Sequence, residues 1–246
     1  MTELLVQHVD QSFDGKQILN DVSLSVKTNE IVSILGVSGI GKTTLFNVIA
    51  GITHPLDGTV VFNGNDITGE AGHLGYMLQK DLLLPFRTIM NNVILPDLVK
   101  GISKKDAIKR ATPLFEFFGL SGYENKYPNE LSGGMRQRAA LLRTFLSTKD
   151  LTLLDEPFSA LDELTKRGIY RWYTDISRQM QNSTLLITHS VDEAITLSDR
   201  IYILSGKPAT ISHEIKITSE ERNKPDFELT SDFIKYKKEI LNILNV

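Results

Sequence analysis

Residues 36–44 read GVSGIGKTT and constrain the fold of this chain more than any other stretch. Gly36, Gly41, Lys42 and Thr43 fit the phosphate-loop pattern G-x-x-x-x-G-K-[ST]. The apolar run IVSIL comes directly before the loop, and the run TTLFNVIA at its end reads as helix. A strand, this loop and a helix in that order predict an α/β nucleotide-binding core, and disfavour a chance glycine-rich turn with a surface lysine.

The loop predicts a specific set of contacts to a nucleotide. Its glycines let the backbone curl so that N–H groups point at the β-phosphate, and the helix N-terminus adds partial positive charge. Lys42 is expected to reach the β- and γ-phosphates, and the Thr43 hydroxyl to bind Mg²⁺. The predicted nucleotide-binding residues of the loop are Gly36, Val37, Ser38, Gly39, Ile40, Gly41, Lys42, Thr43 and Thr44.

Two further apolar runs bring polar side chains to strand ends. The run LTLLDEP ends a predicted strand at Asp155 and Glu156, where Asp155 is expected to hold Mg²⁺ and Glu156 to activate the attacking water. A solvated strand end is the alternative for either acid alone, and the phosphate loop elsewhere in the chain disfavours it. The run STLLITH places His189 at another strand tip, where it can touch a γ-phosphate; by itself this histidine also suits a purely structural role.

Composition excludes several kinds of chemistry. The 246 residues carry a formal net charge of -3, which gives no electrostatic reason to expect nucleic acid as a partner. The chain has no cysteine, so disulfides and thiolate metal sites are excluded. The N-terminal residues lack the pattern of a signal peptide, and no apolar run approaches the ~20 residues of a membrane span. We therefore expect any work at a membrane to require partner subunits.

Periodicity predicts the remaining organisation. Three stretches rich in β-branched and aliphatic residues predict an antiparallel β layer, at 3–9, 22–27 and 59–62. Helical patterns occur at 42–50, 104–118, 133–148, 162–180 and 191–198. Strand signals vanish between 80 and 148, which predicts a helical insertion. The last stretch, SDFIKYKKEILNIL, is expected to form a helix that packs on the core through Phe233, Tyr236, Ile240 and Leu244.

The order of motifs resembles the ATP-binding subunit of ATP-binding-cassette (ABC) transporters over essentially the whole chain. Phe13 matches the aromatic position that stacks on adenine, and Gln79 matches the Q-loop. LSGGMRQR at 131–138 matches the family signature, SALD at 159–162 the D-loop, and His189 the switch histidine. The resemblance implies an ATPase that uses ATP and Mg²⁺, with Lys42, Glu156 and His189 as catalytic residues and Thr43, Gln79 and Asp155 as metal ligands.

The fold class that follows is α/β: a P-loop NTPase (RecA-like) core with an antiparallel β layer and an inserted α-helical subdomain. The predicted nucleotide-binding core comprises residues 1–79 and 149–217. Residues 80–148 form the predicted helical signature subdomain, and residues 218–246 the C-terminal tail and helix.

The signature stretch predicts a second phosphate site. Ser132, Gly133 and Gly134 open a helix whose free N–H groups and dipole attract a phosphate. The resemblance implies a head-to-tail dimer in which they face the γ-phosphate held by the other copy. A plain N-cap by Ser132 is the alternative, but it leaves two glycines that destabilise a helix by ~1 kcal/mol each. Asp162 is expected at the twofold seam, and Gln79 is expected to report the nucleotide state to the helical insertion.

The segment GYMLQKDLLLPFRTIMNNV is most similar to an import branch that serves nitrate, sulfonate, taurine, bicarbonate or pyrimidine-type solutes. This resemblance implies transmembrane permease subunits that dock on the helical subdomain, an extracytoplasmic solute-binding protein, and a peripheral location at the cytoplasmic face of the cell membrane. The run DLLLPFRT suits either an apolar docking surface or a buried turn. Two other classes stay open, namely an ABC ATPase of DNA repair or translation and a monomeric P-loop kinase.

Overall fold

The computed structural model describes residues 2–148, 150–159, 161, 163–224 and 226–244, so Asp162 lies outside the described residues. Packing divides the chain into two compact units. The first unit comprises Met1–His73 and Ser183–Val246, and the second comprises Leu74–Asn182. This division groups residues 149–182 with the helical segment, whereas the sequence places them in the nucleotide-binding core. The predicted boundaries, which follow function, stay a prediction.

The first unit contains the predicted antiparallel layer. Its strands lie in the order β2-β1-β4-β5 and pair antiparallel. Asp14 and Gly15 join the first two strands, and both have positive φ values, 50° and 74°, as a two-residue hairpin turn requires. The strands are β1 (Thr2–Phe13), β2 (Lys16–Lys27), β4 (Asp57–Phe62) and β5 (Asn65–Asp66).

A second group of strands in the first unit lies in the order β10-β9-β3-β8. β3 (Ile31–Leu35) pairs parallel with β8 (Ser183–Thr188) and β9 (Arg200–Ser205), and β10 (Thr210–Lys216) pairs antiparallel with β9. Every residue of β3 and β8 is buried, as their continuous apolar runs predict.

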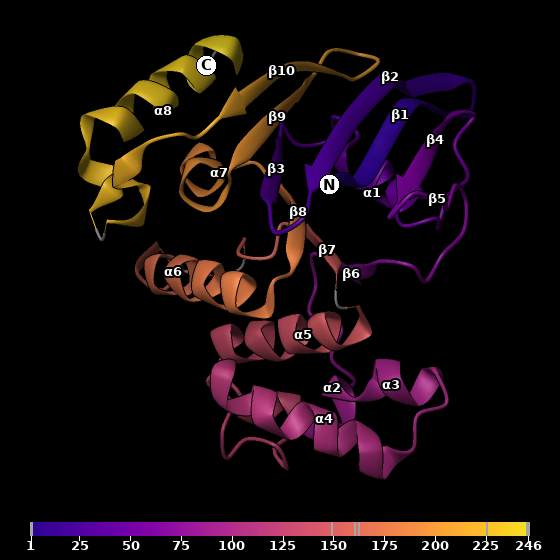
Figure 1. Ribbon diagram of the computed structural model, residues 1–246, viewed down its shortest axis with the longest axis vertical. Helices are drawn as coiled ribbons and strands as arrows, with labels where there is room; N and C mark the ends of the chain where they lie inside the picture. Colours follow the sequence, from indigo (N-terminus) through magenta and orange to yellow (C-terminus); the bar gives the residue numbers. More distant parts are fainter. Residues whose placement is uncertain (1, 149, 160, 162, 225, 245–246) are drawn as a thin grey trace. The chain divides into compact units, whose positions relative to one another are not determined.

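Helices α1 (Lys42–Ile49) and α7 (Val191–Leu197) belong to the same unit. The chain then passes through two 3₁₀ helices, η2 (Glu220–Asn223) and η3 (Phe227–Leu229), to α8 (Ser231–Leu244), which lies beside α7 (Figure 1). The predicted core contacts of α8 are confirmed, because Phe233 and Ile240 are buried and Tyr236 and Leu244 pack partly buried against the same cluster.

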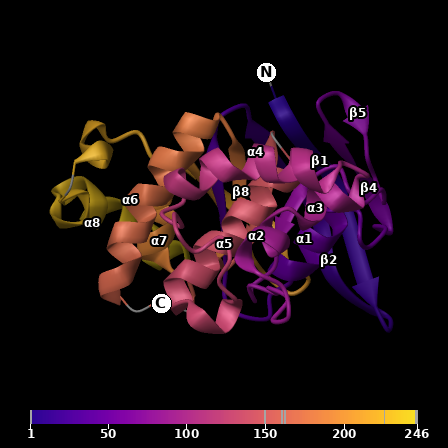
Figure 2. The ribbon, with the colours of Figure 1, turned by 90° about the horizontal axis from the view of Figure 1, so that it is seen from below.

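The second unit contains the predicted helices around a short pair of parallel strands, β6 (Gly75–Met77) and β7 (Leu151–Asp155). In Figure 2, α5 is contacted by three other helices of this unit, α2, α3 and α4. Edge-to-face contacts of Phe118 with Phe145 and Trp172 link α5 to α6. The helices are α2 (Ile89–Val93), α3 (Leu95–Val99), α4 (Lys104–Phe117), η1 (Pro128–Glu130), α5 (Gly133–Ser147) and α6 (Glu163–Met180).

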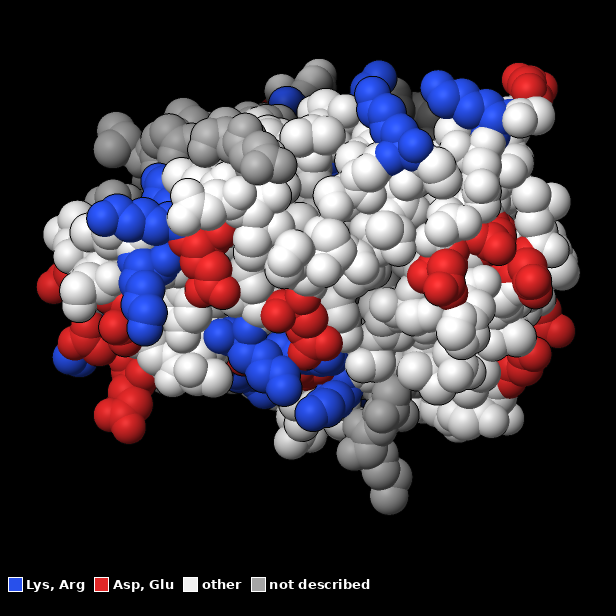
Figure 3. Space-filling model, turned by 90° about the horizontal axis from the view of Figure 1, so that it is seen from above, with Lys and Arg blue, Asp and Glu red and all other residues white. Residues whose placement is uncertain are grey.

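The surface agrees with the balanced composition. In the left half and centre of Figure 3, basic side chains lie beside acidic ones on the face shown. None of the helices in the described part of the chain combines the length and the apolar character that a membrane span requires.

Candidate active site

The phosphate loop joins β3 to α1 and is tightly packed at two of its glycines, Gly36 and Gly41. A Cβ atom at Gly36 would lie 2.8 Å from the carbonyl oxygen of Leu204, on β9. Gly41 has a φ of 115°, and a Cβ there would lie 2.9 Å from the Ile18 Cγ2 atom, on β2. Both contacts rule out a larger residue without movement of the chain, so the conformation of the loop is fixed by the first unit itself.

Lys42 is the charged group of this loop. Its side chain is buried, and Nζ donates to the carbonyl oxygens of Gly36 and Val37 at 2.7 and 3.0 Å. These bonds hold the ammonium group across the loop, while Val37, Ser38 and Gly39 are exposed at its tip. No side chain caps the N-terminus of α1. The loop therefore offers a positive charge and first-turn N–H groups to a phosphate.

His189 and Gly36, the first residue of the phosphate loop, follow the ends of two adjacent strands. Leu35, the last residue of β3, pairs with Thr188, the last residue of β8. Gly36 and His189 directly follow these two partners, so both leave the carboxyl edge of adjacent parallel strands, where α/β sheets bind ligands. His189 is exposed, and Ser190 after it caps α7 by accepting from the Glu193 N–H at 3.3 Å.

Phe13 lies at the end of β1 and is 48% exposed. It pairs with Lys16 across the hairpin turn, two residues before Ile18, whose Cγ2 atom leaves no room for a Cβ at Gly41 of the loop. The hairpin that carries the predicted adenine-stacking residue is thus packed against the phosphate loop.

The second unit carries the predicted carboxylates. Asp155 is buried at the end of β7, and its negative charge acts on Tyr76: burial first, and then this charge, raise the pKa of the Tyr76 hydroxyl above its usual value. Glu156 has a φ of 47°, a left-handed conformation that is unusual for glutamate and typical of functional sites. Gln79 Nε2 donates to Glu156 Oε2 at 3.2 Å, so two predicted site residues 77 positions apart meet directly.

Two arginines that sequence reasoning missed hold the segment after Gln79. Arg143 donates to the carbonyl oxygens of Asp81 and Leu82 at 2.5 and 2.9 Å. Arg136 Nε lies 3.4 Å from the Asp81 carboxylate. Both arginines come from α5, the helix that follows the signature, and their spacing of seven residues places them on one helix face. That spacing shows only that the two side chains share a helix face, and no local signal identifies Asp81 as their common target.

The signature turn has the geometry of a capped helix start. The Ser132 side chain accepts from the Met135 N–H at 3.3 Å, so the N-cap alternative correctly describes the serine. The cap explains Ser132, but it does not explain why the next residue, Gly133, is a glycine. A Cβ atom at Gly133 would meet no atom within 4 Å, and its φ value lies outside the left-handed region. Nothing in the described chain therefore requires glycine at this position.

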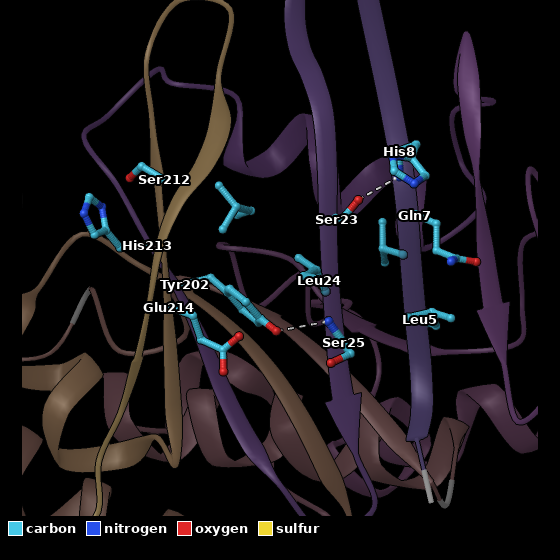
Figure 4. Close-up of a pocket in the computed structure, with 12 residues that line it drawn as sticks. Leu5, Gln7, His8, Ser23, Leu24, Ser25, Tyr202, Ser212, His213 and Glu214 are labelled. Atoms are coloured by element: carbon cyan, nitrogen blue, oxygen red, sulfur yellow. Dashed lines mark hydrogen bonds between the residues drawn. The ribbon is translucent and has the colours of Figure 1, made fainter.

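A cavity of about 500 Å³ lies elsewhere in the first unit, between β1 and β2 on one side and β9 and β10 on the other (Figure 4). The Tyr202 hydroxyl accepts from the Ser25 N–H at 3.3 Å and from Arg200 at 2.8 Å. Arg200 also donates to Glu214 at 3.3 Å. These polar groups are paired with one another, and the cavity shares no residue with the predicted nucleotide site, so we assign it no ligand.

Comparison with known proteins identifies the class. The family model described as ABC transporter matches residues 19–159, more than half of the chain. The chain is 44% identical to the formylaminopyrimidine import ATP-binding protein ThiZ of Halalkalibacterium halodurans, over 84% of this chain and 81% of the relative. It is 36% identical to the nitrate import ATP-binding protein NrtD of a Synechocystis species, over 98% and 94%.

A solved structure of a related protein supports the same class. The dimeric structure of a post-hydrolysis state of the ATP-binding cassette MJ0796, bound to ADP and Pi, matches with a TM-score of 0.75 at 27% identity, over 88% of this chain and 99% of that one. The chain therefore belongs to the ABC transporter family, and both the resemblance and the fold class predicted from the sequence are confirmed. Membership of this family leaves the alternative of a monomeric P-loop kinase without support.

Proposed function

We propose that this chain is the ATP-hydrolysing subunit of an ABC importer, in which two copies close around two ATP molecules and drive a small solute through separate membrane subunits. Support for import comes from the relatives, which are named as import ATP-binding proteins for formylaminopyrimidine, nitrate and taurine. Support for hydrolysis comes from the related cassette bound to ADP and Pi. The solute belongs to the same range of small nitrate-, sulfonate-, taurine- or pyrimidine-type molecules.

The dimeric structure of the related cassette MJ0796 is the observation that carries the dimer, and the open space at Gly133 suits it. Glycine in a helix is less stable than alanine by up to about 1 kcal/mol, and here no contact within the described chain offsets that loss. A glycine is retained where another molecule must approach the backbone closely. In the proposed dimer that molecule is the ATP held by the other copy, and Ser132, Gly133 and Gly134 face its γ-phosphate while Asp162 lines the twofold seam.

The site residues divide the reaction among them. Phe13 stacks on the adenine, and Lys42 leaves the Gly36 and Val37 carbonyls to bind the β- and γ-phosphates. Glu156 takes a proton from the attacking water in line with the γ-phosphate. The hydrogen bond from Gln79 fixes the direction of that carboxylate, and His189 stabilises the charge that develops on the transferred group.

The residues present fit a Mg²⁺ ion. The predicted ligands offer only oxygen donors, from the Thr43 hydroxyl, the Gln79 amide and the Asp155 carboxylate, as this hard cation prefers. When bound, Mg²⁺ neutralises phosphate charge.

The permease subunits dock, in this proposal, on the helical segment after Gln79. Leu82 and Phe86 are 51% and 73% exposed, while Leu83 is buried. The run that contains them is thus neither wholly a buried turn nor wholly surface, and its exposed part offers apolar area to a partner. Docking there places the chain at the cytoplasmic face of the membrane, on the side opposite the extracytoplasmic solute-binding protein.

The test is Glu156→Gln, compared with Glu116→Gln at an exposed position of α4. Loss of the general base slows hydrolysis by ~10²-fold or more, leaves ATP affinity unchanged and traps ATP-bound dimers. Single-turnover hydrolysis, ATP binding and sedimentation with ATP measure the three effects. Undiminished turnover of Glu156→Gln refutes the role of Glu156, and an ATP-loaded monomer refutes the composite site.

A further inference from the structure

The C-terminal segment, residues 218–224 and 226–244, lies beyond the stretch that the family model matches, which ends at residue 159. We propose that this segment positions α7 and with it His189, so that it sets the rate of ATP hydrolysis without contributing to ATP affinity. The inference rests on the proposed role of His189. Lys237 and Arg222 act here as positioning residues.

Apolar packing joins the segment to α7 and to the end of β3. Phe233 and Ile240 of α8 are buried in one cluster with Ala194 and Ile195 of α7. Leu35 belongs to the same cluster and is 1% exposed. Because Leu35 precedes the phosphate loop and pairs with Thr188, the cluster supports the two strand ends from which the loop and His189 depart.

Two polar contacts fix the ends of α7. At its first turn, Lys237 Nζ lies 2.7 and 2.9 Å from the two carboxylate oxygens of Asp192, three residues after His189. At its last turn, Arg222 donates to the Leu197 carbonyl oxygen at 2.7 Å, and this bond satisfies a C-terminal carbonyl of the helix. Lys237 thus contacts the first turn of α7, and Arg222 contacts its last turn.

The contact at the last turn continues into the core of the unit. Arg222 also donates to Asp199 Oδ1 at 2.5 Å, and Asp199 Oδ2 accepts from the N–H of Ile31, the first residue of β3, at 2.8 Å. The segment itself is closed by bonds from Ser219 to Asp232 and from the Thr218 N–H to Tyr236, at 2.7 and 3.0 Å. These bonds join the stretch that leads into η2 to α8.

A helix as short as α7 depends on such contacts. It has seven residues, and a helix of two turns has no stability of its own in water, so its direction is set by what packs against it. His189 directly precedes Ser190, the N-cap of α7, and its place follows the place of the helix start. Lys237 and Asp192 are 41% and 50% exposed, so their ion pair adds little to global stability. A change at Lys237 then alters position and leaves the fold intact.

The experiment measures turnover and ATP affinity of Lys237→Glu, Arg222→Gln and their combination, with Lys235→Glu as the matched charge reversal at an exposed position of α8. Displacing a group that contacts the transferred phosphate lowers kcat by ~3- to 10-fold for each variant, while ATP affinity stays as in the unchanged chain. The melting temperature is unchanged in Lys237→Glu, whose ion pair is exposed, and falls in Arg222→Gln, which loses the bonds of a nearly buried side chain. Lys237→Arg restores kcat, and Lys235→Glu behaves as the unchanged chain.

His189→Ala is measured in parallel to separate the two claims. If His189→Ala abolishes turnover while Lys237→Glu and Arg222→Gln keep full kcat, the positioning role is wrong and the role of His189 stands. If His189→Ala itself keeps full kcat, the role of His189 is wrong and the inference falls with it. A loss of ATP affinity in Lys237→Glu equal to its loss of kcat also overturns the inference, because a displaced His189 does not weaken binding.

Discussion

The phosphate loop and the signature turn are both glycine-rich starts of helices, yet the reasons for their glycines differ. At Gly36 and Gly41 of the phosphate loop, atoms of Leu204 and Ile18 lie within 3 Å of any added Cβ. At Gly133 of the signature turn, no atom lies within 4 Å of one. The chain's own packing requires the first pair of glycines, whereas no contact within the described chain requires the glycine at 133.

The polar groups of the two turns also differ. The phosphate loop has a buried lysine with two bonds to its own carbonyl oxygens and no side-chain cap on its helix. The signature turn has no lysine, and Ser132 caps its helix. A cation beside a helix N-terminus attracts an anion by charge, whereas a neutral turn with a side-chain cap offers only short-range contacts. This difference is what the proposed division into a primary nucleotide site and a closing surface predicts.

The largest effect on turnover is expected from Ser132→Arg. The long side chain fills the open space above the signature turn and prevents the approach of the other copy's nucleotide, so hydrolysis falls by at least ~10²-fold while the chain still binds ATP. Steady-state hydrolysis and ATP binding by the isolated chain measure the two quantities.

The matched control is Ser103→Arg. Ser103 caps α4 as Ser132 caps α5, by accepting a backbone N–H at 3.2 Å, and it lies in the same unit. Each variant loses one cap, worth ~1 kcal/mol of stability, but only Ser132→Arg loses turnover. Normal hydrolysis by Ser132→Arg contradicts a site completed by a second copy.

A smaller and different effect is expected from Lys42→Ala. Hydrogen bonds to a charged group contribute about 1.5–3 kcal/mol each, so loss of the ammonium group weakens ATP binding itself by ~10- to 100-fold. Titration with a fluorescent ATP analogue measures the affinity, and Lys27→Ala, at an exposed position of β2, is the control. Unchanged affinity in Lys42→Ala means that the loop is not the primary nucleotide site.

Local patterns predicted most of the fold. The helices at 42–49, 104–117 and 133–147 end within one residue of their predicted bounds, because apolar periodicity and capping residues mark them strongly. The strand at Arg200–Ser205 was missed although its run RIYILS is rich in β-branched and aromatic residues, and its parallel pairing with β3 joins Val32 to Arg200, 168 positions along the chain. The five-residue helices α2 and α3 were too short to show a period.

The residues of the candidate site were predicted, but their contacts were not. Glycine spacing and acidic strand ends are local signals, and they pointed to the loop, to Asp155 and to Glu156. The left-handed backbone at Glu156 has no such signal, because glutamate rarely adopts it. The bond from Gln79 to Glu156 and the bonds from Arg143 to Asp81 join residues more than 60 positions apart, so only the fold determines them.

The comparison of the two turns is tested most closely by the pair Gly36→Ala and Gly133→Ala, which add the same methyl group to each. At Gly36 the new Cβ meets the Leu204 carbonyl oxygen at 2.8 Å, so the chain must shift, and we expect a loss of ~1–3 kcal/mol in the free energy of unfolding. At Gly133 alanine fills open space in a helix and leaves the free energy of unfolding unchanged or slightly higher.

The rate of ATP hydrolysis gives a second test of Gly133→Ala. The methyl group at Gly133 stands where the nucleotide of the other copy must approach, so hydrolysis falls by ~5- to 10-fold in a chain of undiminished stability. Urea unfolding and hydrolysis, measured on the same preparations, give both quantities. If Gly133→Ala hydrolyses ATP at the normal rate, or unfolds as easily as Gly36→Ala, the glycine at 133 serves the chain's own fold and the distinction between the two turns is lost.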